Sequence, residues 1–183
     1  MSEKYRFLYL CTSNVCRSPL AESVARSSLQ TLGIPEETVS VSSRGLTDSY
    51  SAWNSPAEPR MVSALSSSSS VVGSRISSGV VDDIKRHRSS PLTRQEVLDS
   101  RTYLLLVTAE HEIWARQAVG ADAVDKAKEE GRITLIHSGG EDIPDPWFGD
   151  ERHYRIVCDT IMDEVPKSVE AIIKKLGLAA GRK

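Results

Sequence analysis

Short hydrophobic runs recur along the chain and predict the strands of a sheet. They are Phe7–Leu10, Val39–Val41, Leu104–Val107 and Ile133–Ile136. The third run is continuous rather than alternating, which is typical of a parallel strand that is covered on both faces. All four runs are therefore predicted to be buried strands.

Segments of helical spacing separate these runs. Hydrophobic residues recur at that spacing over Leu20–Leu29, Glu110–Val119 and Tyr154–Leu176. Pro166 is expected to end or kink the last helix. Thr93 followed by Glu96 is a capping box, which predicts one more helix start. Strands that alternate with helices predict an α/β fold: a doubly wound, four-stranded parallel sheet with helices on both faces.

One segment departs from this alternation. Residues 63–79 are rich in serine and include the unbroken run Ser66–Ser70. Such a segment buries little hydrophobic surface, so it is predicted to be a mobile surface insertion. Because the alternation resumes after it, residues 1–183 are expected to form a single domain.

Composition and charge exclude several classes of protein. Hydrophobic residues make up 39% and charged residues 26% of the chain, and the formal net charge is −2. This balance gives no broad basic surface for nucleic acid or for an anionic membrane. No hydrophobic run reaches the roughly 20 residues of a membrane span. The N-terminus lacks a signal-peptide pattern, so the expected location is the cytoplasm.

The cysteines and histidines limit the chemistry further. Cys11 and Cys16 share one turn and Cys158 is remote, so no disulfide framework is expected. Cys158 falls in a predicted helix and is expected to be a buried, inert thiol. No cluster of cysteine and histidine has the spacing of a zinc site, and we expect neither metal nor cofactor. Isolated histidines are assigned to the surface or to local hydrogen bonds: His111, His137 and His153.

The segment between the first strand and the first helix carries the strongest chemical signal. It runs from Cys11 to Pro19 with the sequence CTSNVCRSP. Ser18 is predicted to cap the helix, and Pro19 suits its first position, where a missing N–H costs nothing. Free N–H groups at a helix N-terminus favour an anion, and the guanidinium of Arg17 can bind two phosphate oxygens at once. With Asn14, which tolerates a left-handed backbone, the segment is predicted to bind phosphate.

The same positive field favours the thiolate form of Cys11. Thiolate attack on phosphorus would expel the substrate oxygen and form a cysteinyl phosphate, while Arg17 and the loop amides stabilise the phosphoryl charge. The candidate substrate-binding residues of the loop are Thr12, Ser13, Asn14, Val15, Cys16 and Ser18. Because the loop itself supplies a positive field, this chemistry needs no metal.

A second loop offers a proton donor. Asp145 begins the segment DPWFG, residues 145–149, which follows the fourth predicted strand. The loops at the carboxyl ends of parallel strands gather at one edge of a sheet, so Asp145 is predicted to lie near Cys11. Its carboxyl group can act as general acid for the leaving group and then as base for water. Trp147 and Trp53 are candidate aromatic walls for a flat substrate ring.

These two segments resemble the signature loop and the acid loop of the low-molecular-weight protein tyrosine phosphatases. The segments 41–45, 53–60 and 87–93 are also similar to the family pattern, so the resemblance covers most of the chain. It implies Cys11 as nucleophile, Arg17 as phosphate clamp and Asp145 as general acid and base.

The resemblance also implies supporting roles. A hydrogen-bond network that shapes the loop is implied for Asn14, Ser18, Ser43 and His87. Trp53 and Trp147 are implied to line the cleft. Cys16 matches the family's second loop cysteine, which can trap the nucleophile as a reversible disulfide. The implied partners are proteins that carry phosphotyrosine, with phosphate or another oxyanion in the site.

Three positions depart from the family pattern. Ser13 stands where the family usually has glycine, Thr108 where it has aspartate, and Ser90 where arginine is typical. If the aspartate and the arginine of the family pattern normally pair with each other, this chain lacks both of them. Another contact must then brace this region.

Related activities remain as alternatives. Protein-arginine phosphatases resemble this pattern with threonine before the second loop cysteine, where this chain has Val15, nearer to the isoleucine of the tyrosine-specific enzymes. Arsenate reductases need a further cysteine pair in mid-chain, which this sequence lacks. A phosphotyrosine-binding pseudophosphatase is opposed by the intact Cys11, Arg17 and Asp145, but the departures at Ser13 and Thr108 keep it open. The sequence thus predicts a metal-independent phosphatase for phosphotyrosine and small aryl phosphates, with arsenate reductase ranked last.

Overall fold

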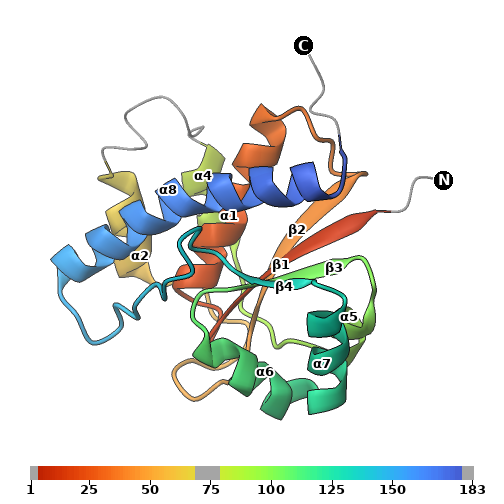
Figure 1. The fold of residues 1–183 in the computed structure, drawn as a ribbon. Coiled ribbons are helices and arrows are strands. Elements are labelled where there is room, and N and C mark those ends of the chain that lie inside the picture. The colour runs from red at the N-terminus through yellow and green to blue at the C-terminus, as the bar shows by residue number, and fades with distance from the viewer. Residues whose placement is uncertain (1–3, 69–78, 179–183) are drawn as a thin grey trace.

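A four-stranded parallel sheet forms the centre of the computed structural model, which describes residues 4–68 and 79–178 (Figure 1). Its strands are β1 (Tyr5–Cys11), β2 (Val39–Gly45), β3 (Thr102–Leu106) and β4 (Ile133–Leu135). Their order across the sheet is β2-β1-β3-β4, and every neighbouring pair is parallel. The predicted sheet is confirmed.

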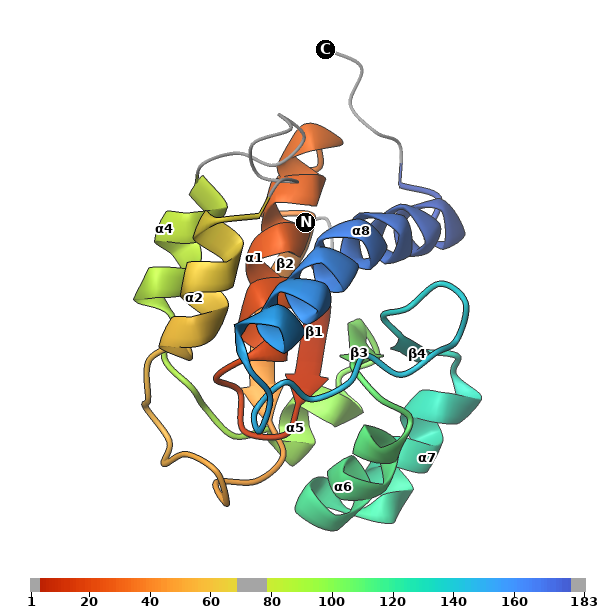
Figure 2. The same cartoon turned by 90° about the vertical axis from the view of Figure 1, so that its left-hand side faces the viewer.

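Helices cover both faces of this sheet, as Figures 1 and 2 show. One face carries α1 (Arg17–Thr31), α2 (Pro59–Ser66), α4 (Gly79–Arg86) and α8 (Glu151–Lys175). The other face carries α5 (Arg94–Leu98), α6 (Glu110–Val119) and α7 (Ala121–Glu129). The doubly wound arrangement is therefore confirmed as well.

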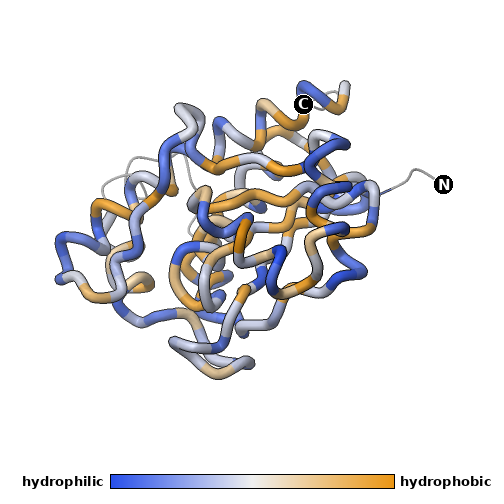
Figure 3. The backbone as a smooth tube through the Cα atoms, turned by 60° about the horizontal axis from the view of Figure 1, so that its bottom comes forward, coloured by the Kyte–Doolittle hydropathy of each residue, from blue (hydrophilic) through white to orange (hydrophobic). Residues whose placement is uncertain are grey.

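The central strand β1 contributes to two hydrophobic cores. Successive side chains of a strand point to opposite faces, so Phe7 and Tyr9 pack on the α1 and α8 side while Leu8 and Leu10 pack on the other. All four side chains are fully buried. Burial of one leucine or phenylalanine stabilises the fold by about 1.5–3 kcal/mol. Figure 3 shows the result, with hydrophobic stretches mainly in the interior and hydrophilic ones mainly at the outer turns.

The helix α8 runs unbroken through Pro166, so the expected end of a helix at that proline does not occur. A proline inside a helix costs about 3 kcal/mol because it removes one backbone hydrogen bond and crowds the preceding turn. Val165 and Val169 are fully buried beside it. Packing of this helix against α1 and α2 outweighs the local cost.

The two ends of the serine-rich segment are helical where the structure describes them. The last turn of α2 includes residues 63–66, and α4 begins at Gly79. Irregular structure was expected at both places. Residues 69–78 lie outside the described residues, so the rest of that expectation stays a prediction. Within residues 4–68 and 79–178, no helix is long and apolar enough to cross a membrane.

Glu164 of α8 fixes the loop that follows β4. Its Oε2 accepts hydrogen bonds from the backbone N–H and the hydroxyl of Ser138, at 2.7 and 2.6 Å. Its Oε1 accepts one from Lys167 Nζ at 2.6 Å. Burial disfavours the charged form of Glu164, but the bonds from Lys167 and Ser138 outweigh it and lower its pKa to about 2. Because the same loop continues to Asp145, Glu164 anchors the segment that carries the candidate acid.

We expect Glu164→Gln to lower the free energy of unfolding at pH 7 by about 1–3 kcal/mol, since a charged acceptor of three hydrogen bonds is lost. The pKa of this glutamate is lower in the folded protein than its ordinary value of 4.5, so its contribution is complete above pH 4.5 and is lost as the pH falls towards 2. Urea unfolding of both proteins from pH 2 to 7 measures this. Glu170→Gln, on the exposed side of α8, is the matched control. A difference that stays constant over this pH range would contradict the assignment.

Candidate active site

The segment from Cys11 to Arg17 forms a tight loop between β1 and α1. Asn14 adopts the left-handed backbone region, with φ of 56°, as its residue type indicated. The N–H groups of residues 13–16 have no hydrogen-bond partner among the described residues. They lie at the N-terminus of α1, where the helix dipole also favours an anion. The predicted loop after strand one therefore has the form of an anion cradle.

Neighbouring segments hold the outside of this loop through its carbonyl groups. The carbonyl oxygen of Thr12 accepts hydrogen bonds from the N–H groups of Leu46 at 2.8 Å and Thr47 at 3.0 Å. That of Val15 accepts one from the N–H of Glu58 at 2.6 Å. With these carbonyls satisfied from outside, the loop keeps its N–H groups for a ligand.

Ser18 does not cap α1, contrary to the prediction. The helix begins at Arg17, and its N-cap residue, Cys16, makes no side-chain cap. Ser18 Oγ instead lies 3.0 Å from Cys11 Sγ and accepts a hydrogen bond from Asn14 Nδ2 at 2.9 Å. Because its oxygen accepts from that amide, its proton is free to be donated to the sulfur. Ser18 therefore contacts the sulfur of Cys11 instead of capping the helix.

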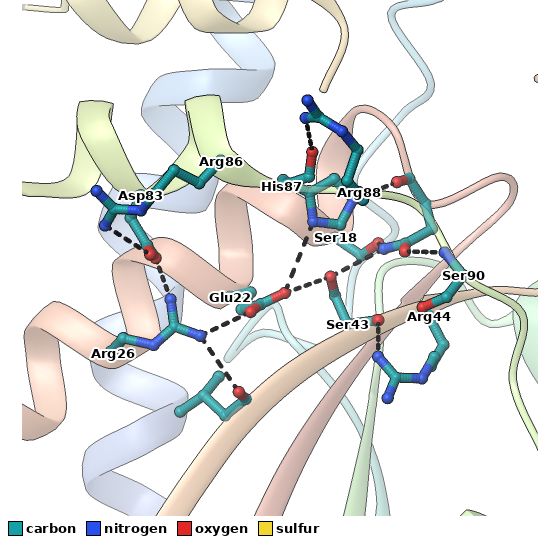
Figure 4. Close-up of polar contacts among 12 residues, drawn as sticks. Ser18, Glu22, Arg26, Ser43, Arg44, Asp83, Arg86, His87, Arg88 and Ser90 are labelled. Carbon is teal, nitrogen blue, oxygen red and sulfur yellow. Dashed lines mark hydrogen bonds and ion pairs between the residues drawn. The ribbon is translucent and has the colours of Figure 1, made fainter. Parts of the chain in front are cut away.

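A chain of hydrogen bonds extends behind the loop, and Figure 4 shows its outer part. Asn14 Nδ2 also donates to Ser43 Oγ at 2.8 Å, and Ser43 Oγ donates to Glu22 Oε2 at 2.6 Å. His87 Nε2 donates to the carbonyl oxygen of Asn14 at 2.7 Å. Burial lowers the pKa of His87, although its bond to Asn14 acts in the opposite direction. The structure thus brings together all the residues for which the sequence implied a network, and it adds Glu22.

The acid loop meets the phosphate-binding loop through Arg17. Its Nη2 donates to Asp145 Oδ2 at 2.9 Å, and its Nη1 donates to the carbonyl oxygen of Ile143 at 3.0 Å. The Arg17 side chain is only 4% exposed, whereas that of Asp145 is 41% exposed. The N–H of Trp147 donates to Asp145 Oδ1 at 3.1 Å. Two segments that are far apart in the sequence are therefore joined by one ion pair.

A small cavity of about 20 Å³ lies between the two loops. It is lined by Cys11, Thr12, Ser13, Val15, Cys16, Arg17, Tyr50, Asp145 and Trp147. Tyr50 was missed in the sequence, because an isolated tyrosine in a polar segment gives no signal. Trp53 is not among the lining residues. Its ring lies against Gly45, where a Cβ atom would come within 2.7 Å of it.

The cysteines outside the nucleophile position are held as neutral thiols. Burial and, to a smaller extent, the neighbouring Cys11 raise the pKa of Cys16 well above its ordinary value. Burial raises the pKa of Cys158 to about 12. Cys158 is fully buried in α8, which agrees with the inert thiol expected from the sequence.

The positions that depart from the family pattern are braced by other contacts. The N–H of Ser90 donates to Asn14 Oδ1 at 3.0 Å. The N–H of Thr108 donates to His111 Nδ1 at 3.2 Å, and His111 Nε2 lies 3.2 Å from Thr12 Oγ1. His111 is therefore buried against the loop, whereas only a surface position or a local bond was expected for it.

The chain matches known proteins along nearly its whole length. The family model described as low molecular weight phosphotyrosine protein phosphatase matches residues 6–178. The chain belongs to this family. Its sequence is also similar to that of a protein-arginine-phosphatase from Bacillus subtilis (strain 168), with 28% identity over 170 residues, which cover 92% of this chain and 96% of that protein. The resemblance seen in the sequence is confirmed.

Structures of low molecular weight phosphatases share the fold. The chain is similar to Bacillus subtilis YfkJ with a TM-score of 0.69 and 20% identity, over 96% of this chain and 98% of that one. It is similar to Vibrio vulnificus Wzb, solved in complex with benzylphosphonate, with a TM-score of 0.68 and 19% identity, over 92% and 99%. The family fold is thus present over nearly the whole chain.

Ser13 replaces the glycine that is usual in this family. Its φ is not in the positive region, so its conformation does not require glycine. Its hydroxyl is buried and has no hydrogen-bond partner among the described residues. A buried hydroxyl without a partner costs about 1–3 kcal/mol. The departure is therefore tolerated by the backbone but is unfavourable for the side chain.

We expect Ser13→Ala to raise the free energy of unfolding by about 1 kcal/mol, because it removes the unpartnered hydroxyl and keeps the backbone conformation. Urea unfolding with the wild-type protein alongside measures the change. The control is Ser89→Ala, since the buried hydroxyl of Ser89 accepts a hydrogen bond from the N–H of Ser55 at 3.0 Å. This control should be destabilised. A loss of stability in Ser13→Ala would show that its hydroxyl has a partner.

Proposed function

We propose that this protein is a metal-independent phosphatase that hydrolyses phosphotyrosine in proteins, and small aryl phosphates, through a cysteinyl phosphate on Cys11. The observation that carries this proposal is the position of the Cys11 thiol. It lies 3.0 Å from the Ser18 hydroxyl, in a loop whose N–H groups at 13–16 have no partner within residues 4–68 and 79–178. It lines the same cavity as the ion pair of Arg17 and Asp145. The expected setting is the cytoplasm, with phosphorylated proteins as partners.

Substrate binding separates the ion pair between Arg17 and Asp145. A cavity of about 20 Å³ has room for about one water molecule, and a phosphoryl group is larger. The phosphoryl oxygens take the place of the Asp145 carboxylate on the guanidinium, which binds two of them at once. The carboxyl group of Asp145 is then free to turn to the leaving oxygen.

In the first chemical step, Cys11 Sγ forms a bond to phosphorus and the bond from phosphorus to the substrate oxygen breaks. Once Asp145 has left Arg17, its carboxylate takes up a proton from solvent and gives it to that oxygen, so the product leaves as a neutral alcohol or phenol. In the second step, the Asp145 carboxylate takes a proton from water while the water oxygen attacks phosphorus. The bond from sulfur to phosphorus breaks, and the Ser18 hydroxyl stabilises the thiolate that is released.

The walls of the cavity support an aryl substrate. Val15 is apolar and buried, and the rings of Tyr50 and Trp147 stand edge to face with their centroids 6.2 Å apart. Flat, apolar walls of this kind favour a phenyl ring over a flexible, charged guanidinium.

A second candidate is a protein-arginine phosphatase. The similarity to the Bacillus subtilis protein of that name supports it, because 28% identity extends over nearly the full length of both chains. The two candidates share the loop, Arg17 and Asp145, and they differ in the groups that meet the substrate beyond its phosphoryl group. Val15 is the loop residue that separates them.

Rates on matched phosphopeptides distinguish these candidates. In the presence of EDTA, we expect kcat/KM to be highest for phosphotyrosine, lower for phosphoarginine and lowest for phosphoserine. Val15→Thr replaces a methyl group by a hydroxyl in a pocket of the same shape, and we expect it to reduce the preference for phosphotyrosine by about tenfold. Cys11→Ser, which removes the nucleophile, should show no turnover on any substrate.

Other outcomes of this experiment have clear meanings. A preference for phosphoarginine would replace the proposed function by the second candidate. Phosphate binding without turnover of any peptide, or of p-nitrophenyl phosphate, would make the protein a phosphate-binding pseudophosphatase. Activity that requires a divalent metal would contradict the mechanism.

The role of Asp145 is tested with a series of aryl phosphates. Asp145→Asn cannot give a proton to the leaving oxygen, so we expect kcat to fall by about 10²–10⁴-fold for phenols of high pKa and far less for phenols of low pKa. The slope of log kcat against leaving-group pKa measures this difference. Glu141→Gln, an exposed carboxylate in the same loop, is the control and should keep the wild-type slope. Equal losses across the series would remove Asp145 from the role of general acid.

A further inference from the structure

The hydroxyl of Thr12 receives hydrogen bonds from two directions. Arg17 Nη2 donates to Thr12 Oγ1 at 3.2 Å, since a guanidinium N–H can only donate. His111 Nε2 lies 3.2 Å from the same oxygen. Thr12 itself is buried in the phosphate-binding loop and lines the cavity beside Cys11. The direction of the contact with His111 therefore decides what the Thr12 hydroxyl can do.

The backbone of Thr108 fixes the tautomer of His111. Two groups of Thr108 contact His111 Nδ1: the backbone N–H at 3.2 Å and the hydroxyl Oγ1 at 3.1 Å. The hydroxyl can donate or accept, but the backbone N–H can only donate, so Nδ1 accepts and carries no proton. The proton of the neutral ring is then on Nε2, which must donate to Thr12 Oγ1. Burial and the positive charge of Arg17 keep the ring neutral, because they lower the pKa of His111 to about 3.

These two donors determine the orientation of the Thr12 hydroxyl. Its oxygen has two lone pairs, and both accept hydrogen bonds, from Arg17 and from His111. Its single proton must therefore be donated to another atom. No acceptor of that proton is found among the described residues. The cavity above the loop is where an acceptor oxygen of a ligand would lie.

We propose that His111 is a positioning residue that fixes the Thr12 hydroxyl as a hydrogen-bond donor to a phosphoryl oxygen held in the loop. The proposal rests on the anion site of the proposed function and deepens it. Thr12 adds one side-chain donor to the N–H groups of residues 13–16 and to Arg17. No proton is transferred, and the histidine touches neither the substrate nor the reacting atoms.

Two substitutions of His111 separate this role from a purely structural one. In His111→Gln, the amide nitrogen reaches the position of Nε2 and still donates to Thr12. In His111→Asn, the side chain is too short to reach Thr12, but its oxygen still accepts from the N–H of Thr108. The two variants remove nearly the same packing, and only the second loses the donor.

Binding of inorganic phosphate is measured by calorimetry in the Cys11→Ser background, where binding does not depend on turnover. We expect His111→Asn to weaken phosphate binding by about five- to tenfold, the effect of losing one oriented hydrogen bond to an anion. His111→Gln should stay close to the unsubstituted background. Equal affinities for both variants and the background would overturn the proposal.

A double-mutant cycle shows whether His111 acts through Thr12. Thr12→Val removes the hydroxyl and keeps the shape of the side chain. Once the hydroxyl is gone, His111→Asn should cause no further loss of phosphate affinity. Losses that add in the double variant would mean that His111 acts on the loop in another way, and they would overturn the proposal.

Nuclear magnetic resonance of the unsubstituted protein tests the geometry without any variant. Correlation of ring protons with ¹⁵N should show His111 as the Nε2–H tautomer throughout pH 5–8. An Nδ1–H tautomer, or titration in this range, would overturn the proposal even if the variants fail to fold.

The proposed phosphatase activity and the role of His111 can be tested separately. If wild-type protein does not hydrolyse p-nitrophenyl phosphate but the binding and tautomer results hold, the proposed function fails and the role of His111 stands. If hydrolysis occurs and the binding results fail, only the role of His111 is removed. Absence of phosphate binding in the Cys11→Ser protein would overturn both.

Discussion

The phosphate-binding loop must leave a row of backbone N–H groups without partners, and much of the surrounding structure makes this possible. A buried N–H without a partner is unfavourable in the absence of a ligand, so the loop cannot be held by its own hydrogen bonds. It is held from outside instead, through carbonyl oxygens and through the side chain of Asn14. Asn14 itself adopts the left-handed backbone conformation within this loop. The segments that supply the outer contacts come from β2, α2 and the loop before α5, and this is why the site needs the whole fold.

The buried charge of Arg17 is the second constraint. A guanidinium that is 4% exposed requires a partner, because an unpaired buried charge is strongly unfavourable. In the absence of substrate that partner is Asp145, and in its presence it would be the phosphoryl group. One cation thus holds the acid loop through Asp145 and Ile143, and in the proposed mechanism it would release Asp145 when substrate binds. The anchoring of the same loop by Glu164 keeps Asp145 near the site while its carboxylate moves.

The parts of the fold that depend on local patterns could be predicted from the sequence, and those that depend on long-range packing could not. The continuous run Leu104–Val107 revealed a buried strand, and α6 has the predicted bounds. The capping box at Thr93 is formed. The helix α8 continues through Pro166 because its buried face outweighs a local penalty, and the local sequence carries no measure of that packing. The short helices α4 and α7 were missed, although buried residues recur at helical spacing in both: Val80 and Ile84 in the first, and Ala123, Val124 and Ala127 in the second.

The same distinction holds within the site. Cys11, Arg17 and Asp145 could be proposed because their chemistry is rare and their neighbours mark a strand end and a helix start, and the structure places all three around one cavity. His111 could not be identified, because its importance depends on a backbone N–H of Thr108 and on a hydroxyl 99 positions earlier in the chain. The family pattern noted in the sequence has an aspartate at the end of the third strand, where this chain has Thr108, whose N–H donates to His111. A carboxylate at this position would add a negative charge near the loop and oppose a bound dianion. Thr108 is neutral, and in the role proposed for His111 its N–H fixes the ring that orients Thr12. A threonine in place of an aspartate therefore changes the charge near the loop but leaves the sequence of the loop unchanged. The loop motif alone does not reveal such a change.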